Sequence, residues 1–126
     1  MARWAHLPVI DDGLDSLKTA VEGAGGRIAV CSGQPANYAG IAAVLLAESA
    51  GAPTLTITGA AGSARTCTIS AYATISITAS DNATHVILHD GVTLWFVTTC
   101  TSQALVSGGT VDIPAWTIVV NQPTAP

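Results

Sequence analysis

The sequence has very little charge for its length. Asp, Glu, Lys and Arg make up 10% of the 126 residues, whereas about 25% is usual in a soluble domain. Surface charge keeps protein molecules apart in solution. We therefore expect this chain to work with its flanks covered, in an oligomer or a larger assembly.

Basic residues are the scarcest charged type. The four of them, Arg3, Lys18, Arg27 and Arg65, are widely separated. A nucleic-acid-binding surface needs clustered Lys and Arg side chains to contact the phosphates. No nucleic-acid partner is expected.

Long hydrophobic runs are also missing. The longest, residues 39–47, contains a glycine and is far shorter than the ~20 residues that span a bilayer. Near the N-terminus, Arg3 is followed by Trp4, Pro8 and acidic residues, which is not the pattern of a signal peptide. We expect no membrane association and no export by that route.

Recognisable catalytic and metal-binding motifs are absent. Cys31, Cys67 and Cys100 form no CxxC pair, so we expect free buried thiols, with one disulfide as the alternative. His85 and His89 would lie roughly 13 Å apart along a strand, too far to share a metal ion. No GxSxG elbow and no phosphate-binding loop occurs. The sequence predicts neither an enzyme nor a cofactor or metal site.

What the sequence does contain is a strong β-hairpin signal. Asp90-Gly91 separates two runs of apolar β-formers, which is typical of a tight turn. If Gly91 closes a three-residue loop in the left-handed conformation, Leu88 pairs with Val92. One face then carries Val86, Leu88, Val92, Leu94 and Phe96, and the other carries His85, Ile87, Thr93, Trp95 and Val97. Because both faces are apolar, the hairpin is expected to be sandwiched or to meet another chain.

The remaining chain alternates between strand and turn patterns. Leu14, Leu17 and Val21 predict a helix over residues 11–22. Residues 37–52 fit a short helix capped by Asn37 or an extended apolar arm. A polar loop is expected around Ser102 and Gln103, and strands are expected at 27–32, 54–58, 66–70, 74–78, 110–113 and 115–120.

These patterns predict a mainly β fold, an antiparallel sandwich or barrel of about seven or eight short strands with one or two short helices near the N-terminus. We expect an N-terminal arm at residues 1–10, a single β-rich domain at 11–120 and a C-terminal tail at 121–126.

Four segments together resemble small virion structural proteins of tailed bacteriophages. They are RIAVCSGQPANY (27–38), GSARTCTI (62–69), ATHVILHDGVTLWFVTTCT (83–101) and GTVDIPAW (109–116). The resemblance implies a virion component that binds by its surface, foremost a capsid decoration (cement) protein. Such proteins often form trimers seated on the major capsid protein, and the virion is assembled in the cytoplasm of the host bacterium.

Other assignments stay open. A neck, tail-tube or tail-tip subunit fits the same resemblance, and a carbohydrate- or host-surface-binding module would need an exposed tryptophan platform. We expect Trp95→Asp and Ile87→Lys to abolish assembly more readily than they unfold the chain. The residues predicted to form the interface are Ile87, Trp95, Val97, Ile41, Leu45 and Trp4.

Overall fold

The computed structural model describes residues 7–59 and 65–120, and of residues 7–13 and 120 it describes the backbone alone. Most of the predicted arm, residues 1–6, and the predicted tail, residues 121–126, lie outside the described residues. The elements in the described part are α1 (Leu7–Val21), β1 (Arg27–Cys31), η1 (Tyr38–Gly40), α2 (Ile41–Val44), β2 (Leu45–Glu48), β3 (Leu55–Thr58), β4 (Arg65–Ile69), β5 (Tyr72–Ser76), β6 (Asp81–His89), β7 (Leu94–Leu105), β8 (Thr110–Ile113) and β9 (Trp116–Val120).

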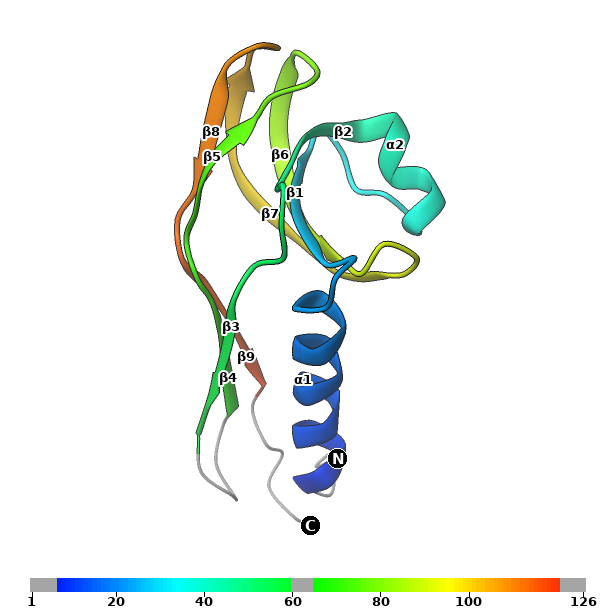
Figure 1. Cartoon of the computed structure of the whole chain (residues 1–126), viewed down its shortest axis with the longest axis vertical. Coiled ribbons are helices and arrows are strands. Elements are labelled where there is room, and N and C mark those ends of the chain that lie inside the picture. Colours follow the sequence, from blue (N-terminus) through cyan, green and yellow to red (C-terminus); the bar gives the residue numbers. More distant parts are fainter. Residues whose placement is uncertain (1–6, 60–64, 121–126) are drawn as a thin grey trace, which may run out of the picture.

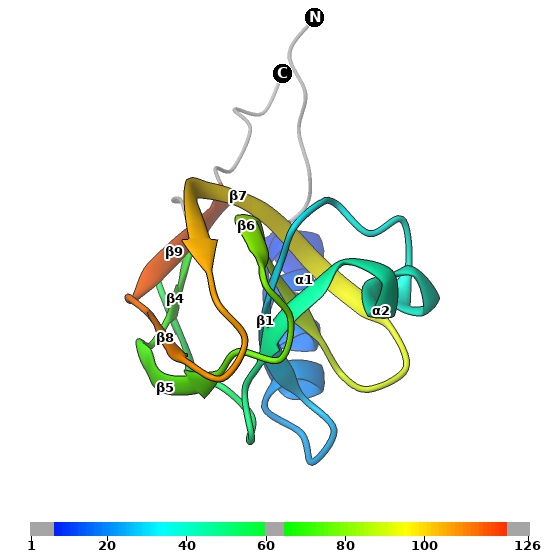
Figure 2. The ribbon, with the colours of Figure 1, turned by 90° about the horizontal axis from the view of Figure 1, so that it is seen from above.

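The strands form three antiparallel sheets in a sandwich-like arrangement, in which the sheets of β3-β4-β9 and β5-β8 follow each other along one side and the four-stranded sheet lies opposite (Figures 1 and 2). One sheet has the order β2-β1-β6-β7, a second β3-β4-β9, and a third pairs β5 with β8. Pro114 lies between β8 and β9, where the chain passes from one sheet to another, as expected of a residue that cannot donate to a ladder. The mainly β, antiparallel fold with short helices near the N-terminus is confirmed.

Helix α1 lies alongside the β3-β4-β9 sheet (Figure 1). Leu14, Leu17 and Val21 are buried on one helix face, as their spacing predicts. The helix begins at Leu7 rather than at residue 11, so residues 7–10, which were predicted to belong to the arm, are part of α1. Pro8 does not prevent this start, because the first N–H groups of a helix have no intrahelical partner in any case.

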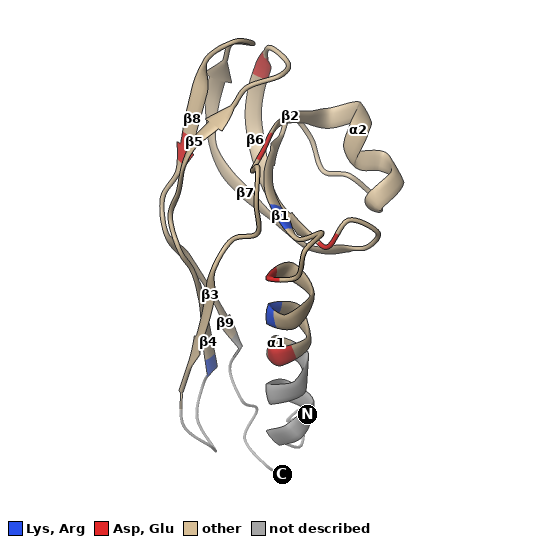
Figure 3. Ribbon diagram, viewed as in Figure 1, with Lys and Arg blue, Asp and Glu red and all other residues tan. Residues whose placement is uncertain are grey.

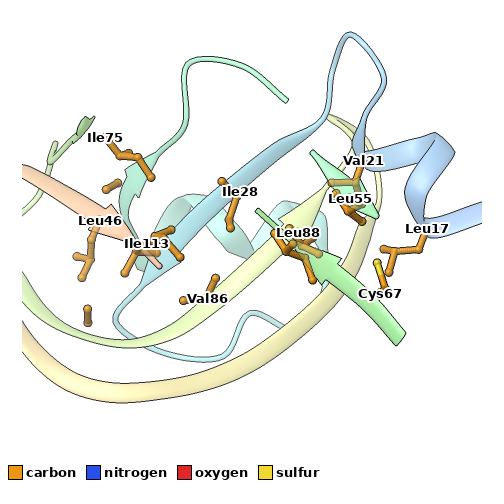
Figure 4. Close-up of a cluster of buried hydrophobic side chains, with 14 of the residues drawn as sticks. Leu17, Val21, Ile28, Leu46, Leu55, Cys67, Ile75, Val86, Leu88 and Ile113 are labelled. Atoms are coloured by element: carbon orange, nitrogen blue, oxygen red, sulfur yellow. The ribbon is translucent and has the colours of Figure 1, made fainter. Parts of the chain in front are cut away.

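The main core runs along the molecule between the sheets (Figure 4). Leu17, Val21, Leu55 and Cys67 meet at one end, and Leu46, Ile75 and Ile113 meet at the other. Between them, β1 and β6 contribute Ile28, Val30, Val86 and Leu88.

A second, smaller core lies on the opposite face of the same sheet. Ala29, Cys31 and Ile87 are buried there against Ile41, with Val44, Leu45, Leu94 and Val97 packed around them. Strand β6 is therefore buried on both faces, as its two-sided apolar pattern predicts. The cover on the second face comes from α2 of the same chain, with Leu45 of the adjoining strand β2 at its margin, so a second chain is not needed to explain it.

The register of the central hairpin differs from the predicted one. Leu88 pairs with Phe96 and not with Val92, and residues 90–93 form a longer loop. Asp90 Oδ1 accepts hydrogen bonds from the N–H groups of Val92 (2.9 Å) and Thr93 (2.7 Å), which closes the loop after Gly91 takes a positive φ of 94°. A bulge after Leu88 then turns Leu94 to the second core and leaves Val92 exposed.

Strand β7 extends further than predicted. Ser102 and Gln103, expected in a polar loop, lie inside the strand, and Gln103 pairs with Ala83 at the start of β6. Their side chains are exposed, so neither face of this half of β7 has an apolar pattern that could reveal the strand.

Residues 37–52 contain the short helical segment that the sequence allowed, whereas the apolar residues after it form a strand of the chain's own sheet rather than the alternative, an extended arm lying on a neighbour. Asn37 Oδ1 accepts a 2.9 Å hydrogen bond from the N–H of Gly40 and so caps η1, as predicted. The chain then makes the single turn of α2 and continues as β2, which pairs with β1.

Candidate functional site

The predicted interface residues do not lie together on one surface. Trp4 is outside the described residues. Ile87 and Ile41 are 0% and 5% exposed in the second core, so their placement at a surface was wrong. The cause is the cover that α2 provides over this face of the sheet, which the alternation of one hairpin cannot indicate. Leu45 and Val97 are half-buried at the margin of the same core.

Of the predicted interface residues that the structure describes, Trp95 is the most exposed, at 38%. Its indole Nε1 donates a 2.9 Å hydrogen bond to Asp90 Oδ2. Trp116 is half-buried, and its ring packs against Phe96 with 5.8 Å between the centroids. A sugar-binding platform would need indole faces and edges open to a ligand, and each of these two tryptophans is partly engaged within the chain.

Among the described residues, His89 and Ser49 are the buried polar residues. His89 is 3% exposed, and its Nε2 lies 2.5 Å from Glu48 Oε1. The N–H of Gly91 donates to Nδ1 at 3.1 Å, so Nδ1 is an acceptor and this hydrogen bonding assigns the proton to Nε2. Tyr38 packs edge-on against the imidazole, with 5.3 Å between the ring centroids. Both nitrogens are engaged, so the ring has no free lone pair to act as a base.

His85 lies apart from this site and hydrogen-bonds through Nδ1 to Thr84 Oγ1 at 2.8 Å. Within residues 7–59 and 65–120, no group of three or more His, Cys, Asp or Glu side chains is placed to hold a metal ion. None of the helices in the described part of the chain has the length and apolar character needed to cross a membrane.

The three cysteines are free thiols. Cys31 and Cys67 are buried, as expected, whereas Cys100 is exposed on β7. Burial, together with the nearby charge of Glu48, raises the pKa of the Cys31 thiol to about 11. Burial also raises the pKa of Cys67. These two thiols stay protonated near neutral pH and are poor nucleophiles.

The most distinctive surface feature is the free edge of β7. This strand is the last in its sheet, so one of its edges has no strand partner among the described residues. Natural edge strands are usually short or protected by charge, proline or a covering segment. β7 has 12 residues and none of them is charged. Figure 3 shows how few charged residues surround it.

A groove runs between β7 and the β8–β9 segment, and we call it the β7 groove. It consists of two hollows of about 290 and 250 Å³ that share Val86, Cys100, Ile113 and Pro114. Consecutive residues of β7, from Thr98 to Thr101, line it. Because neighbouring residues of a strand point to opposite faces, the groove follows the edge of β7 rather than one face.

The floor of the β7 groove is part of the main core. Val30, Val86 and Ile113 belong to that core and also line the groove. Trp116 lines it too, and its Nε1 is buried without a hydrogen-bond partner in the described structure. A buried donor left unpaired costs about 1–3 kcal/mol.

Sequence reasoning did not identify this groove. The available signal was the absence of any charged residue between Asp90 and Asp112, which includes the whole of β7. Among the described residues that line it, the groove contains no nucleophile placed beside a base. It presents the unpaired backbone groups of the β7 edge next to an apolar floor. Comparison with known proteins adds no assignment, because no protein-family model, no curated protein and no solved structure matches the chain.

Proposed function

We propose that this chain is a non-enzymatic structural protein of a tailed-bacteriophage virion, most specifically a capsid decoration protein that oligomerises and binds the head shell. The observation that carries the proposal is the uncharged, 12-residue free edge of β7 beside an apolar groove. Such an edge pairs readily with another chain, so it suits a protein that functions within an assembly.

The scarcity of charge supports the same proposal. Charged residues are 10% of the chain, and several large apolar side chains are open to solvent, with Val92 76% exposed, Val106 68% and Val119 55%. In an assembly these side chains would be covered, and little charge would have to be desolvated. The two engaged nitrogens of His89 and the protonated thiols of Cys31 and Cys67 support a binding role over catalysis.

A neck, tail-tube or tail-tip subunit is the second candidate. β7 ends one sheet and β9 ends another. Two different free edges allow contacts in which one edge of each copy meets the other edge of the next, and such head-to-tail contacts form a ring when the rotation between copies closes and an open filament when it does not. Rings are the architecture that necks and tail tubes require.

The test has two measurements on the full chain. We expect native mass spectrometry to find a defined oligomer, with a trimer favoured, and we expect the protein to co-sediment with purified mature heads of the phage that encodes it. Co-sedimentation with necks or tails, or formation of larger rings, would select the second candidate. A monomer at all concentrations that binds neither heads nor tails would contradict both.

A further inference from the structure

The β7 groove is an open side of the sandwich, where terminal strands lie on both sides of an apolar floor. β7 is a terminal strand on one side of it, and β8 and β9 are terminal strands on the other. Figure 2 shows β7 and β9 along the same side of the molecule. An extended segment in this groove could pair its backbone with β7 while its alternate side chains cover the apolar floor.

The largely uncharged lining of the β7 groove points to the chemistry of the occupant. The free edge of β7 presents backbone N–H and C=O groups that are unpaired within the described residues, and every extended segment carries the complementary backbone groups. Thr98, Thr99, Cys100 and Thr101 line the groove without charge, so the segment they receive should be largely uncharged as well.

We propose that the β7 groove receives residues 1–6 of a second copy of this chain, added as a β-strand along the free edge of β7. This inference rests on the proposed function, because it names the contact through which that protein would self-associate. It places Trp4, a predicted interface residue, in the β7 groove of a neighbouring copy.

Length and sequence favour residues 1–6 as the occupant. As a strand, residues 1–6 would span about 17 Å from first to last residue, which fits within the stretch of β7 from Thr98 to Leu105, about 24 Å at 3.4 Å per residue. Residues 1–6 contain neither proline nor glycine, whereas residues 121–126 contain Pro123 and Pro126, which cannot donate to a ladder.

Charge also favours this segment. Asp112 is the charged residue among those lining the groove, and Arg3 is the charged side chain in residues 1–6. A single opposite pair at the rim would set the register of the inserted strand more than its affinity. Trp4 would supply the large apolar side chain that an edge-docking strand needs to cover a core floor.

Disulfide trapping tests the contact directly, because Cys100 is exposed in the groove while Cys31 and Cys67 are buried. The probe is the Ala5→Cys variant of the full chain, which keeps Arg3 and Trp4. Isotopically labelled and unlabelled copies are mixed and oxidised with diamide. We expect a disulfide between the Ala5→Cys thiol and Cys100 of another copy, identified as linked peptides of mixed isotopic form and lost when Cys100→Ser is added.

Three outcomes of the trapping experiment would overturn the proposal. The linked peptides could come from a single isotopic form, which would mean insertion into the same chain. The linked dimer could persist with Cys100→Ser, or no linked peptide could form. Each is incompatible with residues 1–6 of a second copy lying in the groove.

A groove-blocking variant supplies an independent measurement. Thr99 and Thr117 are exposed and line the groove, so the double variant Thr99→Arg/Thr117→Arg should fold and obstruct it. We expect the dissociation constant for self-association to rise by at least about tenfold, as when a central interface contact is lost. Thr56→Arg, at an exposed position of β3 outside the groove, is the matched control and should change it less than about twofold.

The inference and the proposed function can fail separately. If the double variant and a chain lacking residues 1–6 oligomerise and co-sediment with heads as the unmodified chain does, the groove contact is wrong and the function stands. If the unmodified chain neither oligomerises nor binds a virion part, the function fails.

Discussion

The indole Nε1 of Trp95 donates a 2.9 Å hydrogen bond to Oδ2 of Asp90, five residues earlier on the other side of the hairpin loop. The second oxygen of the same carboxylate accepts the N–H groups of Val92 and Thr93. The side chain of Asp90 therefore stabilises both the hairpin loop and the start of β7. The polar edge of Trp95 is engaged within its own chain, and its exposed ring is what remains for a partner.

The first prediction is a pH dependence of stability at Asp90. The hydrogen bonds from Trp95, and then those from Val92 and Thr93, lower the pKa of this carboxyl from its usual 3.8. The stabilisation by ionised Asp90 is therefore complete above about pH 4 and is lost as the pH falls through the lower pKa of the folded state. Urea unfolding of the unmodified chain and Asp90→Asn should differ by a constant free energy near neutral pH, and the difference should shrink below about pH 4. A difference that stays constant down to about pH 2 would contradict the assignment.

The second prediction separates two substitutions on the same hairpin. Ile87 is fully buried between β1, β7 and α2, so Ile87→Lys should lower the free energy of unfolding by about 4 kcal/mol or more. Ile87→Val, the conservative control, should cost about 0.5–1.5 kcal/mol. Trp95→Asp, at a 38% exposed position, should remain folded. Thermal melts check all three, and an Ile87→Lys protein as stable as the unmodified chain would refute the second core.

The third prediction concerns the junction of α1 and β3. Glu22 Oε2 accepts the N–H of Leu55 at 2.7 Å, and Lys18 Nζ donates to the carbonyl of Leu55 at 2.8 Å and to Glu22 Oε1 at 2.5 Å. Burial raises the pKa of Glu22, but the bonds from Lys18 and Leu55 outweigh it and lower the pKa overall. Because the pair is partly exposed to solvent, Glu22→Gln should cost only about 1 kcal/mol.

Hydrogen exchange gives the readout for that junction. The Leu55 amide should exchange faster in Glu22→Gln than in the unmodified chain, because the carboxylate that accepts from it is replaced by a weaker acceptor. Asp15→Asn, an exposed change on the same helix, is the control and should leave that rate unchanged. An unaltered exchange rate in Glu22→Gln would show that Glu22 does not protect the Leu55 amide at this junction.

The fourth prediction is a stabilising change at Thr74. This residue has a φ of 59°, a conformation that β-branched side chains rarely adopt. Its N–H donates to Asp112 Oδ1 at 2.7 Å, which holds the strained backbone in place at the irregular pairing of β5 with β8. Asparagine tolerates the left-handed region, so Thr74→Asn should raise the free energy of unfolding by about 0.5–1 kcal/mol. Thr56→Asn, in a regular strand, should not raise it, and a loss of stability in Thr74→Asn would argue against the strained backbone.

The fifth prediction concerns thiol reactivity. In dilute native protein a thiol reagent should modify Cys100 first, because its side chain is exposed whereas those of Cys31 and Cys67 are buried. Burial raises the pKa of all three thiols, so accessibility decides the order of reaction. Cys31 and Cys67 should react only after unfolding by urea, and mass spectrometry after timed labelling distinguishes the sites. Early modification of Cys31 would be inconsistent with its place under α2.

Several features were determined by the sequence alone, because they depend on neighbours along the chain. The spacing of Leu14, Leu17 and Val21 specified the buried face of α1, and Asn37 specified a cap. Asp90-Gly91 located the central turn, and alternating apolar residues located most strands, since side-chain direction repeats every two residues in a strand whatever it pairs with.

Only the tertiary structure decided what each strand meets. The burial of Ile87 under α2 and the contact of His89 with Glu48 join segments distant in sequence. The bulge that pairs Leu88 with Phe96 lies within one hairpin, but its position is set by how the two strands pack into the sheet. The free edge of β7 is likewise defined by which strand is last in the sheet. Local periodicity indicates which face of a strand a side chain lies on. Which strands pair, and which segment covers a sheet face, depend on packing over the whole chain. The β7 groove could therefore be identified only from the fold.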